Sequence, residues 1–350
     1  MAKRIRVSDD AGANYYTLPG GSGEFSQEAG DLDDTIFGFD YKSAESGLIK
    51  WGVSADALYK GFAGYLATIK KPSTGTTFTG EAFTLESTRI YQITNASKQI
   101  WDRTGTFVFK DGGVDHTADI EWVDYLFGRI KFKDTYTVSG AVTADGKYFP
   151  TVTIGKANGF TITQSMEAIE TTDFDTAQAN SGYRTFIAGL RTVSADLTGI
   201  YNVSNAFIAA LQARSEILVE FCPEGLGRSV ARGFFKYSGQ GQSGDVGALE
   251  EEKVSLRLNV PDLSSLAYSL YLPFQWRHSA TSTLSTAVKK MLKNWETGAL
   301  MKVQYLYDGT NGRVGDTVVT EASLSGGVDD MNKFTAQFQG TGSHSAVGTG

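Results

Sequence analysis

Alternating apolar and polar positions predict half-buried β-strands in two segments of the chain. In residues 48–57 (LIKWGVSADA), apolar side chains occupy every second position from Ile49 onward. Residues 190–198 (LRTVSADLT) contain the same tetrapeptide, Val-Ser-Ala-Asp, at 193–196. Since this tetrapeptide also stands at 53–56, we expect the two strands to hold equivalent positions in a repeated unit.

Two other segments have apolar residues at helical spacing. A helix is expected over 285–295, with Thr283 or Ser285 as its N-cap and Gly298 as its C-terminal stop. A shorter helix is expected over 204–214. The apolar positions are Leu284, Val288, Met291, Leu292 and Trp295 in the longer helix, and Phe207, Ile208 and Leu211 in the shorter one.

The order of these segments indicates an internal duplication. Each helix is followed by a strand, at 301–309 (MKVQYLYDG) and at 217–225 (ILVEFCPEG), and then by a hairpin whose last strand alternates. Upstream, an acidic loop leads into each Val-Ser-Ala-Asp strand. Several segments that recur in the same order are the signature of a repeat.

The spacing of the matching segments predicts the domain arrangement. One copy is continuous over 146–263, and the other is formed by 1–71 together with 264–350. Residues 72–145 predict a small inserted β-module. Its expected strands lie at 104–110, 120–125, 128–133 and 136–142, with turns at Asp111-Gly112-Gly113 and Asp145-Gly146 separating some of them. The expected fold class is mainly β, with two β-sandwich or barrel domains that each carry one α-helix, plus the module.

Composition agrees with a mainly-β chain and narrows its function. The 350 residues include 40 glycines and only 6 prolines, with Asp-Gly and Gly-Gly pairs that suit tight turns. The net charge of −7 disfavours a protein that binds nucleic acid tightly, because affinity for phosphates comes mostly from Lys and Arg. The N-terminus MAKRIRVSDD does not resemble a signal peptide, and no stretch of about 20 apolar residues occurs. We therefore expect folding in a reducing cytoplasm and no membrane insertion.

Residues that often carry chemistry are few and scattered. Cys222 is the single cysteine and is expected to be a buried thiol, while His116, His278 and His344 are expected to be solvated. A G-x-G-x-x-G pattern at 239–244 is followed by alternating residues instead of the helix that a dinucleotide site needs. We expect a hairpin loop there, with no cofactor and no catalytic residue in the chain.

One acidic loop resembles the beginning of a calcium-binding loop. It contains Asp31, Asp33 and Asp34, but Ile36 and Lys42 stand where an EF-hand needs glycine and glutamate. Weak cation binding by this loop is left open, and no metal site is expected. Carboxylate pairs elsewhere occur in loops, where glycosidase chemistry cannot be told from solvated charge without a fold.

The matching segments resemble the major tail tube proteins of phages with long non-contractile tails. In the continuous copy the likeness lies in RTFIAGLRTVSADLTG, NAFIAALQAR, ILVEFCPEG and EEEKVSLRL. In the interrupted copy it lies in LIKWGVSADALYKGFAGY, LSTAVKKMLKNWETG and MKVQYLYDGTNGRVG. Together these segments and their surroundings span roughly two-thirds of the chain.

The resemblance implies a structural virion protein with a self-assembling β-fold. Subunits of this family pair strands into rings around a channel, and the rings stack into a tail tube through which double-stranded DNA passes without specific binding. Most members have one tube domain and form hexamers, so two domains imply a homotrimer that makes a pseudo-hexameric ring. The implied partners are further copies of the chain and the tail terminator, tape measure and distal tail proteins. Carboxylates that face the channel would repel DNA.

Ring stacking is expected to use two acidic loops, 29–47 and 168–185, because they have matching places in the repeat and because the family stacks through such a loop. The residues assigned to these contacts are Asp31, Asp33, Asp34, Asp40, Glu170, Asp173 and Asp175. One alternative is a phage or cell-surface β-protein whose inserted module binds host glycans. Another is an enzyme on a β scaffold, which would need a concave pocket with convergent carboxylates of perturbed pKa.

Overall fold

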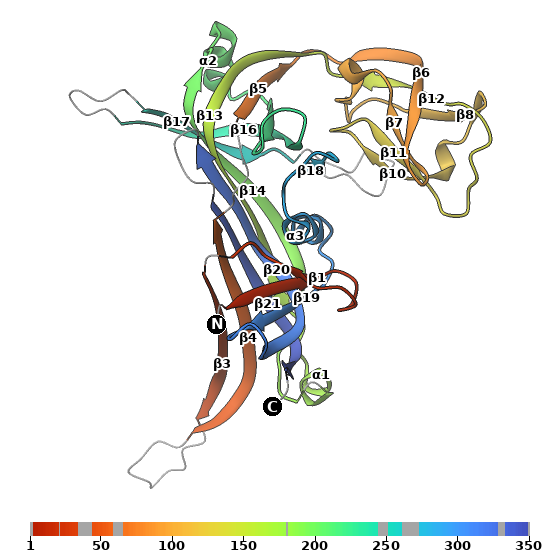
Figure 1. The fold of residues 1–350 in the computed structure, drawn as a ribbon. Helices are drawn as coiled ribbons and strands as arrows, with labels where there is room; N and C mark the ends of the chain where they lie inside the picture. Colours follow the sequence, from red (N-terminus) through yellow and green to blue (C-terminus); the bar gives the residue numbers. More distant parts are fainter. Residues whose placement is uncertain are drawn as a thin grey trace.

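Strands dominate the fold (Figure 1). The computed structural model describes residues 3–20, 22–33, 44–58, 66–179, 181–243, 251–260, 273–327 and 333–348. Within these residues, 14 strands form one large sheet and 7 strands form a second sheet. The predicted mainly-β class is confirmed.

The first unit of the large sheet combines the two ends of the chain. Its strands pair antiparallel in the order β2–β1–β19–β20–β21–β4–β3, so that Arg4 in β1 lies opposite Leu306 in β19. The elements are β1 (Arg4–Ser8), β2 (Tyr16–Thr17), β3 (Ser22–Asp33), β4 (Ala44–Leu58), α3 (Thr286–Thr297), β19 (Met301–Leu306), β20 (Gly312–Gly327) and β21 (Lys333–Val347).

The second unit is a closed cylinder of six strands. The pairing runs β5–β15–β16–β17–β14–β13 and returns from β13 to β5. The elements are β5 (Leu66–Pro72), β13 (Thr151–Glu170), β14 (Phe186–Tyr201), α2 (Asn205–Gln212), β15 (Ile217–Cys222), β16 (Ser229–Ser243) and β17 (Glu251–Leu258). A short helix, α1 (Phe174–Ala179), lies between β13 and β14, and β18 (Phe274–His278) pairs with β16.

The two units have the same order of elements along the chain. β1, β3, β4, α3, β19, β20 and β21 of the first unit correspond to β5, β13, β14, α2, β15, β16 and β17 of the second. Local details match as well. Val53 and Val193 of the shared tetrapeptide are buried, with 3% and 4% exposure. Gly309 and Gly225, in the turns after β19 and β15, both have a positive φ, 86° and 83°.

The strand pairing differs from the expected division of the chain in two places. β5 lies within the range 1–71 that was expected in the interrupted copy, but it pairs with β13 and β15. β18 lies within 264–350, but it pairs with β16. The choice of partner strand depends on packing between distant segments, which the local apolar pattern does not contain.

Both predicted helices are present. The predicted apolar positions of α3 are buried, whereas in α2 Phe207 is buried and Ile208 is 50% exposed. Ser285 is the N-cap of α3, where its hydroxyl accepts a hydrogen bond from the Val288 N–H at 3.3 Å. Gly298 ends the helix in the left-handed conformation, with φ of 71°. Trp295 of α3 and Phe207 of α2 are 3% and 1% exposed, so both helices cover the core of their units.

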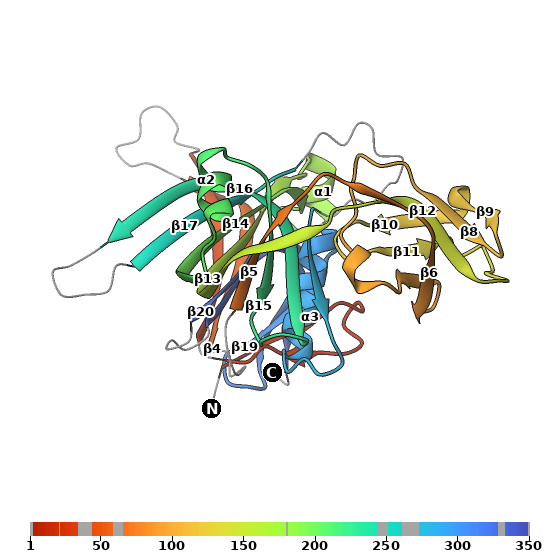
Figure 2. The same cartoon turned by 90° about the horizontal axis from the view of Figure 1, so that it is seen from above.

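Residues 76–148 form the second sheet, which we call the module. Its strands pair in the order β10–β11–β7–β6–β12–β8–β9, and it projects to one side of the large sheet (Figure 2). Its elements are β6 (Thr76–Ser87), β7 (Ile90–Ile93), η1 (Ala96–Lys98), β8 (Val108–Asp111), β9 (Val114–Asp115), η2 (Thr117–Asp119), β10 (Ile120–Asp124), β11 (Arg129–Phe132) and β12 (Val142–Tyr148).

The expected strand over 136–142 and the expected turn at Asp145-Gly146 are wrong. Strand β12 begins only at Val142 and continues through Gly146, with a register irregularity beside it. A Cβ atom on Gly146 would lie 2.4 Å from the Phe107 ring, so close packing, and not a turn, requires glycine here.

Candidate assembly interface

Eight long strands form one continuous surface across both units. They lie in the order β3–β4–β21–β20–β13–β14–β17–β16, and Figure 1 shows most of them running together along the molecule. Side chains alternate between the two faces of such a sheet. One face packs into the core, where Val53, Ile162 and Leu324 are at most 3% exposed. The opposite face, which we call the polar face, carries mainly Ser, Thr, Gly, Gln and charged residues.

The polar face carries charges of both signs. Glu28 lies opposite Lys50 across β3 and β4, and the Lys253 ammonium contacts the Asp196 carboxylate at 3.1 Å. Directly opposed charges of opposite sign stabilise a sheet. By register, the charged residues with described side chains on this face include Glu24, Glu28, Asp56, Asp196 and Glu321, with Lys50, Lys236, Lys253, Arg257 and Lys333. The net negative charge of the chain is therefore not concentrated here.

The two units meet through direct strand pairing. β13 of the second unit lies antiparallel to β20 of the first, from Gly159 opposite Gly327 to Ser165 opposite Glu321. On the core side of this junction, Ile162 lies opposite Leu324 and both are buried. Gln164 is also buried, and its side-chain oxygen accepts a hydrogen bond from the Trp276 indole N–H at 2.5 Å. The junction is thus a packed interface inside one chain.

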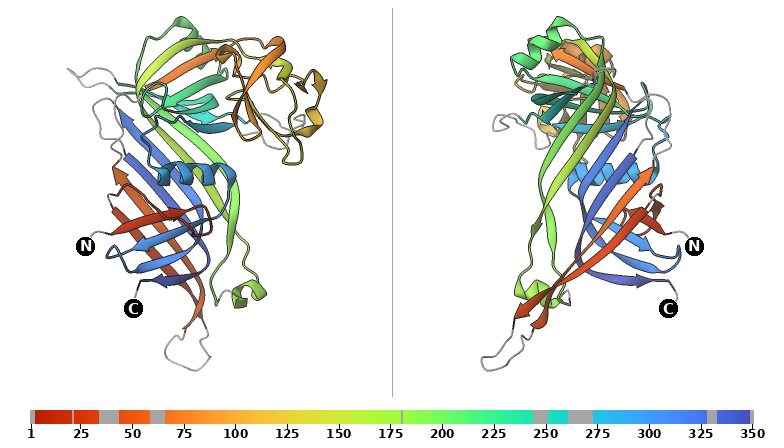
Figure 3. Two further views of the ribbon diagram at one scale, coloured as in Figure 1. Left: turned by 45° about the vertical axis from the view of Figure 1, so that its right-hand side comes forward. Right: turned by 90° about the vertical axis from the view of Figure 1, so that its left-hand side faces the viewer.

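The described parts of both acidic loops lie at the same end of the molecule. In Figure 3, α1 and the far ends of β3 and β4 are close together, at the opposite end from the second unit's cylinder. The β13–β14 loop is anchored there by the first unit, since the Ile49 N–H donates to the Gly182 carbonyl and the Arg184 N–H donates to the Ile49 carbonyl, both at 2.8 Å. Phe186 N–H also donates to the Thr341 hydroxyl at 2.9 Å. This loop is held in place by strands of the other unit.

The assigned stacking residues are only partly within the described structure. Asp34 and Asp40 lie outside the described residues, and for Asp31 and Asp33 only the backbone at the end of β3 is described. Glu170 is exposed and pairs with Arg184 at 3.1 Å. The other two assigned residues, Asp173 and Asp175, are exposed. The Asp173 carboxylate accepts from the Thr176 N–H at 2.6 Å, and hydrogen bonds to Thr176 lower the pKa of Asp173.

Three guanidinium groups around one aromatic ring attach the module to the second unit. Arg129 of the module, Arg232 of β16 and Arg277 of β18 lie 5.5, 4.6 and 5.9 Å from the centre of the Phe127 ring. The Arg232 guanidinium also donates to the Leu126 carbonyl at 3.1 Å. Residues from three separate parts of the sequence therefore converge on the 125–128 turn.

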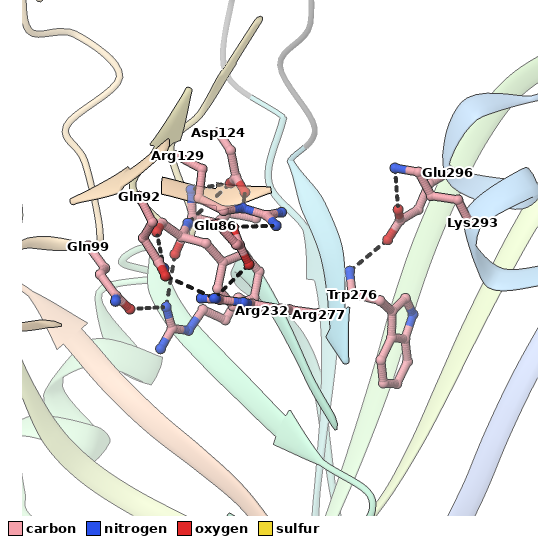
Figure 4. Close-up of polar contacts among 12 residues, drawn as sticks. Glu86, Gln92, Gln99, Asp124, Arg129, Arg232, Trp276, Arg277, Lys293 and Glu296 are labelled. Atoms are coloured by element: carbon pink, nitrogen blue, oxygen red, sulfur yellow. Dashed lines mark hydrogen bonds and ion pairs between the residues drawn. The ribbon is translucent and has the colours of Figure 1, made fainter. Parts of the chain in front are cut away.

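Acidic and amide side chains also take part in this contact between the module and the second unit (Figure 4). Glu86 of the module contacts Arg277 at 2.8 Å and Arg129 at 3.5 Å. Gln92 accepts a hydrogen bond from Arg277 at 2.8 Å, and Asp124 pairs with Arg129 at 2.8 Å. The sequence analysis did not identify this cluster. Arginines spread over 129–277 with no shared motif give no local signal that they meet.

A buried carboxylate connects the second unit to the segment before α3. Glu224 is 2% exposed and accepts from the Ser229, Ser282 and Thr283 hydroxyls at 2.5, 2.8 and 2.6 Å. It also accepts from the backbone N–H groups of Thr283 and Leu284 at 2.6 and 3.1 Å. Burial alone would raise the pKa of Glu224, but these hydrogen bonds outweigh it and lower the pKa to about 2.

Ser229, His278 and Glu224 lie together at this site, but they do not have the geometry of a hydrolase catalytic triad. Ser229 lies 3.0 Å from the Nδ1 atom of His278, but its hydroxyl donates to Glu224, and the whole residue is 0% exposed. His278 is half-buried instead of fully solvated as expected. Burial first and Lys289 second lower its pKa to about 4. Cys222 is buried as expected, and burial raises its pKa to about 12.

A second buried carboxylate, Glu296, has a raised pKa, in contrast to the lowered pKa of Glu224. Glu296 of α3 is 3% exposed, accepts from the Trp276 backbone N–H at 2.6 Å and lies 3.5 Å from the Lys293 ammonium (Figure 4). Burial raises the pKa of Glu296 to about 7, because it outweighs the opposing effects of Lys293 and of the hydrogen bond. Glu296 is therefore protonated in the folded protein at mildly acidic pH.

Glu296→Gln should remove a loss of stability between pH 4.5 and 7. In this range the carboxyl of the unfolded chain ionises while the folded carboxyl keeps its proton, so stability falls as pH rises. One pKa unit corresponds to about 1.4 kcal/mol, which makes the loss about 3 kcal/mol. Urea unfolding at a series of pH values measures the effect. Identical pH profiles for the variant and the wild type would contradict it.

The G-x-G-x-x-G pattern falls in a strand and its following residues. Gly239 and Gly241 belong to β16 and pair with Ser255 and Lys253 of β17, while residues 244–250 lie outside the described structure. No described helix follows directly, so the phosphate-binding arrangement of a dinucleotide site is absent from the described part. Within the described residues, no group of three or more His, Cys, Asp or Glu side chains is placed to hold a metal ion.

Comparisons with known proteins leave the family of the chain open. No protein-family model matches the sequence, and no curated protein matches it significantly. In the described part of the chain the longest helix, α3, has 12 residues, fewer than the about 20 residues that a membrane-spanning helix needs. Function must therefore be argued from the geometry alone.

Proposed function

We propose that the protein is a structural component that assembles into rings and stacks them into a tube, as in a phage tail. The observation that carries this proposal is the eight-stranded surface with an open strand at each end. Among the described residues, β3 pairs only with β4, and residues 239–243 of β16 pair only with β17. Unpaired strand edges promote association, and closing a ring between subunits removes them from water.

The ring of this proposal contains three chains. Each chain supplies two units of the same topology, so three chains place six units around the axis. The contact is head-to-tail, because the open strand of one unit meets a different open strand on the next chain. Such contacts close into a ring when the rotation between chains fits, and stacked rings give a filament.

The polar face suits the wall of a channel for double-stranded DNA. Hydroxyl, amide and small residues dominate it, and its carboxylates and basic groups stand side by side. DNA binds tightly where Lys and Arg neutralise many phosphates. The described side chains on this face provide no such excess of positive charge, so DNA would pass without being held. The proposed location is the virion tail.

Negative-stain electron microscopy of the purified protein tests this function. We expect hollow filaments built from stacked rings, with six-fold density modulated to three-fold. The modulation arises because the module is attached to only one of the two units in each chain. A protein that stays monomeric at high concentration, measured by sedimentation, would contradict the proposal.

We expect ring stacking to fail when the acidic loops are altered. Replacing residues 31–40 with a short Gly/Ser linker should leave rings but no tubes, and Asp173→Asn with Asp175→Asn should shorten the tubes. The described parts of these loops, at α1 and at the far ends of β3 and β4, lie at one end of the molecule, where rings would meet. Asp134→Asn in the module, whose side chain is 80% exposed, is the matched control. Tubes of normal length from the loop variants would refute the assignment.

The glycan-binding alternative has less support. A glycan platform needs exposed aromatic side chains, but most large aromatic residues of the module pack inside it. Trp101, Phe107 and Phe109 are at most 3% exposed and contact one another in its core.

A further inference from the structure

The junction between the two units provides a template for a contact between chains. In each unit, two strands have an outer edge. One is the strand after β19 or β15, which is β20 or β16. The other is the long strand before the Val-Ser-Ala-Asp strand, which is β3 or β13. Inside the chain, the edge of β20 is paired with the edge of β13. The corresponding edges, at residues 239–243 of β16 and along β3, have no strand beside them in the described residues.

We infer that β16 of one copy pairs antiparallel with β3 of a second copy, with Ser26 opposite Gly239 of the neighbouring chain. This inference rests on the proposed self-assembly and adds to it the strands and their register. The same register places Glu24 opposite Gly241 and Ser22 opposite Ser243. A shift of one residue would turn every side chain to the wrong face, so the register is a specific property of the contact.

The register depends first on which residues of the long strands β3 and β13 are equivalent. Ser26 lies opposite Gly52 in β4, two residues before Ser54 of the shared tetrapeptide. Ser165 lies opposite Thr192 in β14, two residues before Ser194 of the same tetrapeptide. Ser26 and Ser165 therefore hold equivalent places in the two units.

The register depends secondly on which residues of β20 and β16 are equivalent, and matching irregularities in their pairing show this. The pairing of β20 with β21 shifts between Val319 and Glu321, and the pairing of β16 with β17 shifts between Tyr237 and Gly239. Glu321 and Gly239 are therefore equivalent. Because Ser165 lies opposite Glu321 in the internal junction, Ser26 should lie opposite Gly239 between chains.

The local surroundings leave room for this contact. Ser26 is exposed, and a Cβ atom added to Gly239 would come no closer than 4.0 Å to Ser255. A groove runs beside the beginning of β3, lined by Ile5, Leu18 and Tyr305 among others. The Tyr305 hydroxyl donates only a long hydrogen bond of 3.4 Å to the Gly23 carbonyl at this edge. An incoming strand would cover this partly apolar groove and supply backbone partners.

Cysteine cross-linking tests the register directly. The test variant is Ser26→Cys with Gly239→Cys, treated in the assembled state with a thiol cross-linker short enough to join only opposed residues. Its internal counterpart, Ser165→Cys with Glu321→Cys, carries the same geometry within one chain. The mismatched variant, Ser22→Cys with Gly239→Cys, sets the cysteines about 13 Å apart along the strands. Cys222 gives no background, because it is 4% exposed and its pKa is raised to about 12.

We expect most of the test variant to become covalent dimers and trimers on a denaturing gel, with no species larger than a closed trimer from one ring. The internal counterpart should link within the monomer, and the mismatched variant should stay monomeric. Mixing chains that carry only Ser26→Cys with chains that carry only Gly239→Cys should give dimers and nothing larger.

Two failures have different meanings. If rings form and the internal counterpart links, but the test variant stays monomeric, the inferred register is wrong and the proposed function stands. If no variant and no wild-type protein assembles, the proposed function itself fails, and the inferred contact fails with it.

Discussion

Arg232→Ala should lower the free energy of unfolding by about 3 kcal/mol and loosen the module from the second unit. Arg232 contacts the Glu220 carboxylate at 2.6 Å, donates to the Leu126 carbonyl at 3.1 Å and lies over the Phe127 ring. Without it, Lys70 is the one cationic partner that remains, among the described residues, for the Glu220 carboxylate, which is 11% exposed. Breaking a buried ion pair costs about 3–5 kcal/mol, and partial exposure places this pair at the lower end.

Urea unfolding and limited proteolysis measure the two parts of this result. The cleavage rate within residues 73–75, between β5 and β6, should rise in the variant if the module has become mobile. Arg313→Ala, an exposed position on β20, is the control and should change stability by less than about 0.5 kcal/mol. Equal stability of both variants would show that Arg232 does not fasten the module.

Glu224→Ala should be more damaging still, at about 4 kcal/mol. It removes the acceptor of five hydrogen bonds, and the buried donors on Ser229 and Leu284 lose this acceptor. Hydrogen bonds to a charged group contribute about 1.5–3 kcal/mol each, and an unsatisfied buried donor adds a cost. The segment that positions α3 would then lose its attachment to the second unit. Thermal unfolding, with exposed Glu167→Gln as the control, measures the loss.

The same carboxylate should make the protein sensitive to acid. The folded pKa of Glu224 is about 2, below its ordinary value of 4.5, so its contribution is complete above pH 4.5 and is lost as pH falls toward 2. The pKa difference corresponds to about 3 kcal/mol. Glu224→Gln should be less stable than the wild type at pH 7, and the difference should shrink steadily below pH 4.5. A constant difference across this range would refute the assignment.

The features predictable from the sequence were those with a local period. The helix over 285–295 has apolar residues at helical spacing, and the Val-Ser-Ala-Asp strands have alternating apolar residues. Each of these elements lies where expected. β6 was missed because most of its side chains are exposed, which leaves no alternating pattern to detect. The pairing of β5 with the second unit was also unpredictable, since the partner strands lie 79 residues or more away in the sequence, counted from Pro72 to Thr151.

The internal repeat predicted part of the site around the buried Glu224 carboxylate. The sequence matched Glu224-Gly225 with Asp308-Gly309, and both glycines have positive φ. Asp308 accepts from the backbone N–H groups of Thr310 and Asn311 at 2.8 and 2.5 Å, within its own turn. The longer side chain of Glu224 reaches residues 282–284 instead. The repeat therefore matched the two turns at Gly225 and Gly309. The hydrogen bonds from Glu224 to residues 282–284 depend on its one extra methylene group and could not be predicted from the sequence pattern.

The interruption of the first unit has a consequence for synthesis on the ribosome. β1 emerges first, but its partner β19 is made near the end of translation, because Arg4 lies opposite Leu306. The second unit and the module are encoded in one run, 66–258, and can fold while the nascent chain is still growing. The first unit is completed only when nearly the whole chain has been released. The proposed polymerisation would thereby be delayed until translation ends, so incomplete subunits on neighbouring ribosomes would not join one another.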